Sequence, residues 1–157
     1  MVTVTGGKWT TYRAMAQDVL KHCVDAKLLA ERHACVTPDL PLVGAQTGCK
    51  VDHPMYEAPG LKAYGDEAAD VAQLPGAERA LGGGLTEAMV RFAVRHEYAR
   101  TVEDVLARRS RLLFLDAKLA GSMAESVGAI IADEIFAHDP DVEAFKALAL
   151  SYLKLPG

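Results

Sequence analysis

The chain contains 157 residues, and its 17 basic and 21 acidic side chains give a formal net charge of −4 at pH 7. This length favours a single domain with a core of useful size, and the charge argues against a strongly basic nucleic-acid binder. No charge-free apolar run reaches the roughly 18 residues of a membrane span, and residues 1–9 lack the basic and apolar regions of a signal peptide.

The first predicted element is a short β-strand. Residues 2–5 read Val-Thr-Val-Thr, an alternating β-branched pattern that is typical of a strand. A lone strand of this length needs a partner, and no later segment offers a sheet of comparable quality. The pattern therefore indicates that the strand belongs to a preceding domain outside this chain; pairing with residues 40–43, or disorder, is the alternative.

Helix and loop are expected to alternate in the rest of the first half. Apolar residues at helical spacing predict a helix over residues 10–32, after the Gly6-Gly7 turn. Prolines and glycines predict a long loop over residues 33–60. The sequence AYGDEAADVAQL (63–74) predicts a short helix capped by Asp66 and ended by Pro75-Gly76, and Gly82-Gly83-Gly84 predicts a break.

The second half is predicted to be helical throughout, so the expected fold class is mainly α, a multi-helix bundle with a short N-terminal strand. Capping residues indicate where these helices begin. The indicated starts are Thr86, for a helix to about Ala99; Thr101 with Asp104, which resemble a capping box; Asp116, before a long apolar-striped helix; and Asp139, followed by Pro140.

Charged residues cluster in the second half. Glu87, Arg91 and Arg95 are spaced four apart and predict one solvated charged stripe with a favourable Glu-to-Arg pair. Most arginines lie between residues 91 and 111, but acidic residues alternate with them, so a salt-bridged helix surface is favoured over a nucleic-acid site. The acidic residues concerned are Glu97, Glu103, Asp104 and Asp116.

An odd cysteine count without a secretion signal predicts free thiols in a reducing compartment. His33, Cys35, Cys49 and His53 offer four ligands of the kind that hold zinc tetrahedrally. Their H-x-C spacing is unusual for a zinc site, however. Loop histidines and half-buried thiols are the favoured interpretation, and no metal is assigned.

Residues 5–13 (TGGKWTTYR) combine a glycine turn with the start of a helix. Glycines allow a ligand to approach the backbone, and the free N–H groups of a helix start favour an anion or a developing negative charge. The spacing matches neither the P-loop nor the dinucleotide fingerprint. From the residues alone, an ordinary strand-to-helix turn with a threonine cap remains the alternative.

Four segments of the chain carry a resemblance to a known family. GGKWTTYRAMA closely resembles the segment after the last strand of the flavin domain in FAD-dependent glycerol-3-phosphate dehydrogenases, the aerobic, quinone-linked type. CVTPDLPLVG, AYGDEAADVAQL and EAMVRFAVRHEYARTVEDVLARRSRLLFLDA resemble the helical C-terminal domain of that family, in the same order. The resemblance implies that residues 1–8 are a remnant of the FAD-binding domain and that residues 9–157 form the C-terminal helical domain.

The same resemblance implies an enzyme that oxidises sn-glycerol 3-phosphate to dihydroxyacetone phosphate, with hydride transfer to FAD and electrons passing to a quinone, or to oxygen in oxidase relatives. Its implied partners are the missing N-terminal FAD domain and a membrane surface contacted peripherally, with no nucleic acid. The isolated chain is expected to be inactive and to hold no FAD, in the cytoplasm or on the cytoplasmic face of the inner membrane. A stand-alone helical protein-interaction domain is the alternative class.

Site residues follow from the resemblance by position. It places Gly6, Gly7, Thr10 and Thr11 at the flavin edge, where a helix N-terminus would also stabilise an anionic reduced flavin. Lys8 is assigned to the flavin carbonyl or the substrate phosphate. Arg13 is assigned to the substrate, with a structural ion pair as its alternative. The histidines show no partner pattern, so no catalytic residue is assigned to this chain; they are His22, His33, His53, His96 and His138.

Overall fold

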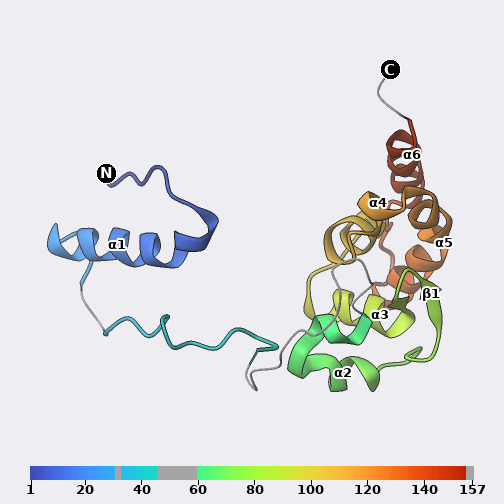
Figure 1. Cartoon of the computed structure of the whole chain (residues 1–157), viewed down its shortest axis with the longest axis horizontal. Helices are drawn as coiled ribbons and strands as arrows, with labels where there is room; N and C mark the ends of the chain where they lie inside the picture. Colours follow the sequence, from blue (N-terminus) through green and yellow to red (C-terminus); the bar gives the residue numbers. More distant parts are fainter. Residues whose placement is uncertain (31–32, 46–59, 155–157) are drawn as a thin grey trace. The chain divides into compact units, whose positions relative to one another are not determined.

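The computed structural model describes residues 1–30, 33–45 and 60–154 (Figure 1). The chain divides into two compact units, Met1–Leu42 and Val43–Gly157, and each is described by itself. The first unit therefore contains both the glycine turn and the helix that follows it. The predicted division after residue 8 concerns a preceding domain, and it stays a prediction.

The first unit consists of an extended N-terminal segment and two consecutive helical elements. The 3₁₀ turn η1 spans Trp9–Thr11, and helix α1 spans Tyr12–Asp25. Neither residues 2–5 nor residues 40–43 form a strand, so the predicted N-terminal strand is wrong for this chain. The physical reason is that extended backbone becomes a strand only when a neighbour satisfies its N–H and C=O groups, and the described residues of this unit supply none.

Helix α1 ends seven residues before the predicted end. The amide of Leu28 donates to the carbonyl of Cys23, and the amide of Lys27 to that of Val24, both at 2.8 Å. Lys27 itself adopts a left-handed conformation with φ 57°. This is the Schellman arrangement that ends helices, in which glycine commonly occupies the left-handed position. Because a lysine stands there instead, the sequence carries no visible stop signal.

The second unit begins with short helical pieces. Gly65, with φ 54° and ψ −124°, interrupts the predicted helix over 63–74. Its cap is not Asp66, because Glu67 occupies the N-cap position and makes no side-chain capping bond. The helical path does end just before Pro75-Gly76, as predicted. The two pieces are η2 (Gly60–Glu67) and α2 (Ala68–Ala72).

The predicted glycine break is the turn of a small hairpin. Strands β1 (Ala80–Gly82) and β2 (Leu85–Thr86) pair antiparallel, and this is the only sheet within the described residues. A Cβ at Gly83 would lie 2.8 Å from a Leu112 methyl group, so the turn needs a residue without a side chain. Strand β2 leads directly into the first long helix of the second unit.

Two of the predicted helix starts in this unit are confirmed by capping hydrogen bonds. Thr86 accepts from the Met89 amide at 3.4 Å, and Asp116 accepts from the Leu119 amide at 2.9 Å. The corresponding helices are α3 (Glu87–His96) and α5 (Ala117–Glu134).

The capping box is also confirmed. The Asp104 amide donates to the Thr101 hydroxyl at 3.2 Å, and the Thr101 amide donates to the Asp104 carboxylate at 3.0 Å. The segment that this box opens continues as a π-helix, η3 (Asp104–Arg109), followed by the short helix α4 (Leu112–Leu115).

The predicted start of the last helix is two residues too early. Helix α6 spans Val142–Tyr152, and its N-cap is Asp141, which is left-handed with φ 58°. The Asp139 carboxylate instead accepts from the Asp141 amide at 3.0 Å. The Pro140 carbonyl accepts from the Val102 amide at 2.9 Å, a contact with the helical turn that precedes η3.

The core of the second unit lies around α5, which packs against α3, α4 and α6 (Figure 1). The mainly α fold class is therefore confirmed. The apolar side of α5 faces inward as predicted, with Met123, Val127 and Ile131 buried. The largest fully buried side chains are Phe145, Leu106, Leu113, Ile131, Val71, Val90, Val102, Val105 and Val127.

Candidate functional site

The glycine turn brings the sequence-predicted site residues together in one short segment. Gly6 and Gly7 both have positive φ, 79° and 102°. A Cβ on Gly6 would meet nothing within 4 Å, whereas one on Gly7 would overlap the Met15 side chain. A side chain at Gly7 would be disfavoured by the positive φ and would displace the end of Met15, whereas Gly6 leaves an open face that a ligand can approach.

Hydrogen bonds of Thr11 hold the turn that follows. Its hydroxyl accepts from the Lys8 amide at 3.2 Å and donates to the Lys8 carbonyl at 3.0 Å, and its amide donates to the same carbonyl at 2.9 Å. As the first two positions of the helical turn, Trp9 and Thr10 have amides with no intrahelical acceptor. Two N–H groups therefore remain available for an acceptor at this helix start.

An open groove of about 610 Å³ runs along the turn and the first half of α1. It is lined mainly by apolar side chains, including Trp9, Met15 and Leu20. Lys8 is its only charged lining residue among those described. The groove thus offers an apolar wall with one cation and the Gly6 backbone at its end, an arrangement suited to a flat ring that carries an acceptor atom.

Arg13 is engaged within its own unit. Its guanidinium donates to Gln17 at 2.8 Å and to the Thr37 hydroxyl at 3.1 Å. It forms no ion pair with any described residue, so the alternative of a structural ion pair is wrong within the described part of the chain; its partners are neutral. Thr37 also contacts the Cys35 thiol at 3.1 Å, and this hydrogen bond lowers the pKa of the thiol.

The zinc hypothesis is only partly accessible to the structure, because Cys49 and His53 lie outside the described residues. Among the described ones, no group of three or more His, Cys, Asp or Glu side chains could hold a metal ion. Cys23 and Cys35 are free thiols.

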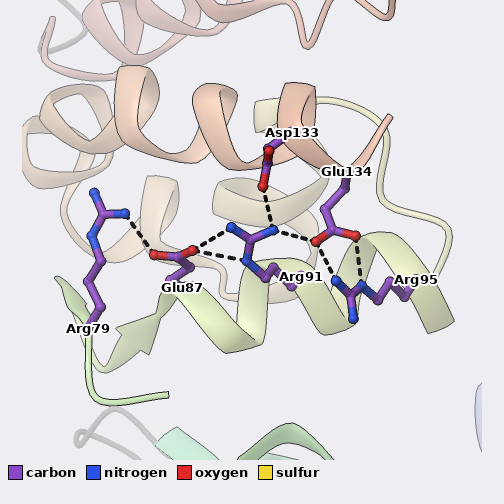
Figure 2. A network of polar contacts seen from close by, with 6 residues as sticks. All are labelled: Arg79, Glu87, Arg91, Arg95, Asp133 and Glu134. Atoms are coloured by element: carbon purple, nitrogen blue, oxygen red, sulfur yellow. Dashed lines mark hydrogen bonds and ion pairs between the residues drawn. The ribbon is translucent and has the colours of Figure 1, made fainter. Parts of the chain in front are cut away.

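A network of charged side chains joins α3 to α5 in the second unit. Figure 2 shows Arg91 at its centre, between Glu87 on its own helix and two carboxylates from α5. Arg91 donates to Glu87 at 2.6 Å and to Asp133 at 2.7 Å, and it also contacts Glu134. Arg95 binds Glu134 through two hydrogen bonds of 2.7 Å, and Arg79 reaches Glu87 at 2.7 Å.

The predicted Glu-to-Arg pair is confirmed between Glu87 and Arg91. The predicted solvated stripe is wrong for these two residues, which are largely buried, whereas Arg95 is exposed. Glu87 is only 7% exposed, and the side chains of Arg91 and Glu134 are 13% and 9% exposed. Hydrogen bonds to Arg91 and Arg79 lower the pKa of Glu87, and the hydrogen bond to Glu134 is the main contribution that raises the pKa of Arg91. Glu87 and Arg91 therefore stay charged and hydrogen-bonded, which is typical of a structural cross-link between helices.

The local spacing of Glu87, Arg91 and Arg95 is visible in the sequence, but their partners on α5 are not. Asp133 and Glu134 lie 39 to 43 residues further along the chain, and no pattern connects them to α3. Two other arginines of the cluster follow the predicted salt-bridged surface, whereas Arg100 donates to backbone carbonyls and Arg111 forms no ion pair with a described residue. Arg108 pairs with Glu103 and Asp104, and Arg109 pairs with Glu97.

In the part of the chain that the structure describes, no helix is long and apolar enough to cross a membrane. The fold therefore defines a mainly α second unit, Val43–Gly157, and a first unit, Met1–Leu42, that carries the glycine turn.

The family of this domain is established by comparison. Residues 35–140 match the family model of the C-terminal domain of alpha-glycerophosphate oxidase, and the chain belongs to this family. The resemblance inferred from the sequence is thereby confirmed for most of the chain.

Curated relatives carry consistent names. The mitochondrial glycerol-3-phosphate dehydrogenase of Arabidopsis thaliana is 34% identical over 85% of this chain and 26% of its own length. Glycerol-3-phosphate dehydrogenase 1 of Mycobacterium bovis is 38% identical over 71% of this chain and 23% of its own length. The chain thus spans about a quarter of these relatives, which are oxidoreductases, and corresponds to their C-terminal part. No solved structure matches.

Proposed function

We propose that this chain is the C-terminal part of an FAD-dependent enzyme that oxidises sn-glycerol 3-phosphate to dihydroxyacetone phosphate and passes the electrons to a quinone. The observation that carries the proposal is the geometry of the glycine turn in a chain of this family. The Gly6 face is open, and the free amides of the helix start lie beside Lys8. The names of the relatives support the substrate.

The residues of the turn fit the edge of a flavin ring. The Trp9 and Thr10 amides can donate to the flavin carbonyl, and the Gly6 backbone presents no side chain to block the ring. Thr11 holds the turn through its hydrogen bonds to Lys8. When bound, FAD supplies the acceptor for the substrate hydride. The protein contributes a helix dipole that favours negative charge at this edge.

Lys8 is proposed to bind the phosphate of the substrate or the flavin carbonyl. Its side chain lines the groove and forms no ion pair with a described residue, so its ammonium group is available to an anion. Arg13 is proposed as a second substrate contact in the complete enzyme. Its present hydrogen bonds to Gln17 and Thr37 would then have to exchange for the ligand.

The exposed apolar surface of the first unit supports a missing partner domain over the alternative of a stand-alone interaction module. Trp9 is 88% exposed, and Tyr12 and Leu20 on α1 are 59% and 58% exposed. An N-terminal FAD domain would cover this surface. The isolated chain is accordingly expected to hold no flavin and to be inactive.

The proposal is tested with a chimera in which this chain replaces the corresponding C-terminal part of the mycobacterial relative. We expect reduction of a quinone-site dye with sn-glycerol 3-phosphate. Lys8→Ala should raise KM for the substrate or lower kcat by roughly 10- to 100-fold, the range for losing a charged hydrogen bond, and Lys8→Arg should recover part of it. Lys21→Ala, an exposed lysine on α1, is the matched control. If the chimera is active and Lys8→Ala changes neither its KM nor its kcat, the role assigned to Lys8 is refuted. If the purified chimera contains no flavin, the proposal that the enzyme binds FAD is refuted.

A further inference from the structure

The C-terminal ends of helices α3 and α5 meet in the second unit. Arg95, in the last turn of α3, binds Glu134, the last residue of α5, through two hydrogen bonds of 2.7 Å (Figure 2). Beyond the helix ends, the His138 ring donates through Nε2 to the Arg100 carbonyl at 2.8 Å. The two segments that follow these helices therefore lie side by side.

Each of these two segments carries an aromatic side chain that the second unit leaves uncovered. Tyr98, two residues after α3, is 84% exposed, and Phe136, two residues after α5, is 97% exposed. The Arg100 guanidinium lies over the Tyr98 ring, 4.8 Å from its centroid, and is itself fixed by donating to the carbonyls of Val94 and Ala99. The Tyr98 ring is therefore held in place although most of it is open to solvent. We call Tyr98, Arg100 and Phe136 the helix-end surface.

Tyr98 occupies a backbone position that favours glycine. Its φ is 64°, and the Ala99 amide donates to the Ala93 carbonyl at 3.0 Å, so Tyr98 is the left-handed residue of the Schellman motif that ends α3. A residue with a Cβ is strained in this conformation. Packing within the second unit does not compensate for the strain, because most of the side chain is exposed. Strained residues of this kind cluster at sites that contact something else.

We propose that the helix-end surface is where the second unit docks onto the N-terminal, FAD-binding part of the complete enzyme. The chain covers only 26% and 23% of the two relatives and matches a C-terminal domain, so most of such an enzyme lies outside it. Two aromatic rings bury roughly 300–500 Å², less than the roughly 800 Å² per partner of a stable dimer. A partner in the same polypeptide needs less area, because the linkage keeps its effective concentration high. The inference rests on the proposed function and names a surface for its missing domain.

Two glycine substitutions separate the role of the Tyr98 ring from the effect of backbone strain. Tyr98→Gly removes both the ring and the strain. Ala137→Gly is the matched control, because Ala137 is also exposed and left-handed, with φ 56°, but carries no ring. In the isolated chain, we expect both variants to raise the urea midpoint measured by circular dichroism. In the chimera with the mycobacterial relative, Tyr98→Gly should lower the midpoint, because a docking anchor is lost, and Ala137→Gly should not.

Photo-cross-linking identifies the docking partner directly. The photoreactive amino acid p-benzoylphenylalanine is placed in the chimera instead of Tyr98 or Phe136. The control position is Glu143 on α6, whose side chain is 84% exposed and has no place in the helix-end surface. After irradiation and proteolysis, mass spectrometry should find peptides of the N-terminal part joined to positions 98 and 136, and none joined to position 143.

Three outcomes would overturn the proposal. They are an absence of cross-links between positions 98 or 136 and the N-terminal part, a cross-linked product of twice the chain mass, which would assign the surface to a second copy, and equal effects of Tyr98→Gly and Ala137→Gly on the midpoint of the chimera. The dehydrogenase assay reports on the proposed function separately. An active chimera without these cross-links refutes the docking surface alone, and an inactive chimera that forms them refutes the proposed oxidation alone.

Discussion

Helix α1 in the first unit and helix α5 in the second are both apolar on one side, yet their surroundings differ completely. Seven of the 18 residues of α5 are buried, including Met123 and Ile131. None of the 14 residues of α1 is buried, and Met15, Val19 and Cys23 are only half covered. Helical periodicity therefore predicts that a face will be covered, but it does not say whether the covering element belongs to the same chain.

This difference has an energetic consequence. An isolated helix of about 14 residues is marginally stable in water, because nucleation is costly and packing supplies most of the stability of helices in proteins. Among the described residues, α5 has that packing from α3, α4, α6, β1 and η3, whereas the neighbouring element of α1 is the short turn η1. In the proposed enzyme, α1 gains its stability from the FAD domain.

Amide hydrogen exchange should show the largest contrast between the two units. We expect the central amides of α5 to exchange only on global unfolding, roughly a thousandfold or more slower than those of α1. The measurement is residue-resolved exchange by NMR or mass spectrometry on the isolated chain. Equal protection of the two helices would mean that α1 packs on a surface within this chain.

Truncation of a core side chain should have a large effect in the second unit and almost none in the first. Leu106 is fully buried, so Leu106→Ala should reduce the free energy of unfolding by about 2–5 kcal/mol. Leu20 on α1 is 58% exposed, and Leu20→Ala should change it by less than about 0.5 kcal/mol. Urea titration followed by circular dichroism measures both, and a large effect of Leu20→Ala would contradict the comparison.

The buried charge network should contribute less than the core but more than a surface ion pair. Arg91→Met leaves Glu87 and Glu134 without their shared partner, and we expect a loss of about 2–3 kcal/mol in the free energy of unfolding, discounted because part of the network is exposed. Arg108→Met removes an arginine whose side chain is 58% exposed and should cost less than about 1 kcal/mol. Equal losses would show that water screens the network.

Protonation of Asp104 at acid pH should lower the stability of the second unit, and we expect this effect to be the smallest of those predicted here. Partial burial raises the pKa of this carboxyl, but hydrogen bonds from the Arg100 and Thr101 amides and from Arg108 outweigh it, and the pKa falls to about 2. A depressed pKa stabilises the fold above about pH 4, and this contribution disappears as the pH falls toward about 2.

Asp104→Asn should therefore lower the urea midpoint at neutral pH and leave it nearly unchanged at about pH 2. Asp18→Asn, an exposed carboxylate on α1, is the control and should have no effect at either pH. A midpoint difference for Asp104→Asn that stays constant with pH would contradict the assigned cause.

Predictions from the sequence succeeded where the signal and its partner lie within a few residues. The caps at Thr86 and Asp116 and the box of Thr101 and Asp104 all formed as predicted, because each hydrogen bond spans only three residues. Two of the helix boundaries that were wrong depend on left-handed residues, Lys27 and Asp141, and neither residue type indicates that conformation in the sequence.

The candidate site shows the same division. The glycine turn was predicted from its residues, and the structure adds that Gly6 faces open space while a side chain at Gly7 would displace the end of Met15. The roles of the turn toward flavin and substrate stay predictions. The hairpin β1–β2 was missed, since strands of two or three residues carry no readable alternation.

The sequence by itself determined the family, the helical class and the sites where the capped helices begin, because these depend on short motifs and on hydrogen bonds between near neighbours. Tertiary structure alone decided that Glu87 and Arg91 are buried in a network with carboxylates of α5 and that the exposed rings of Phe114 and Tyr152 meet. Both outcomes depend on partners dozens of residues away. Burial is set by how helices pack in space, and no local pattern of residues carries that information.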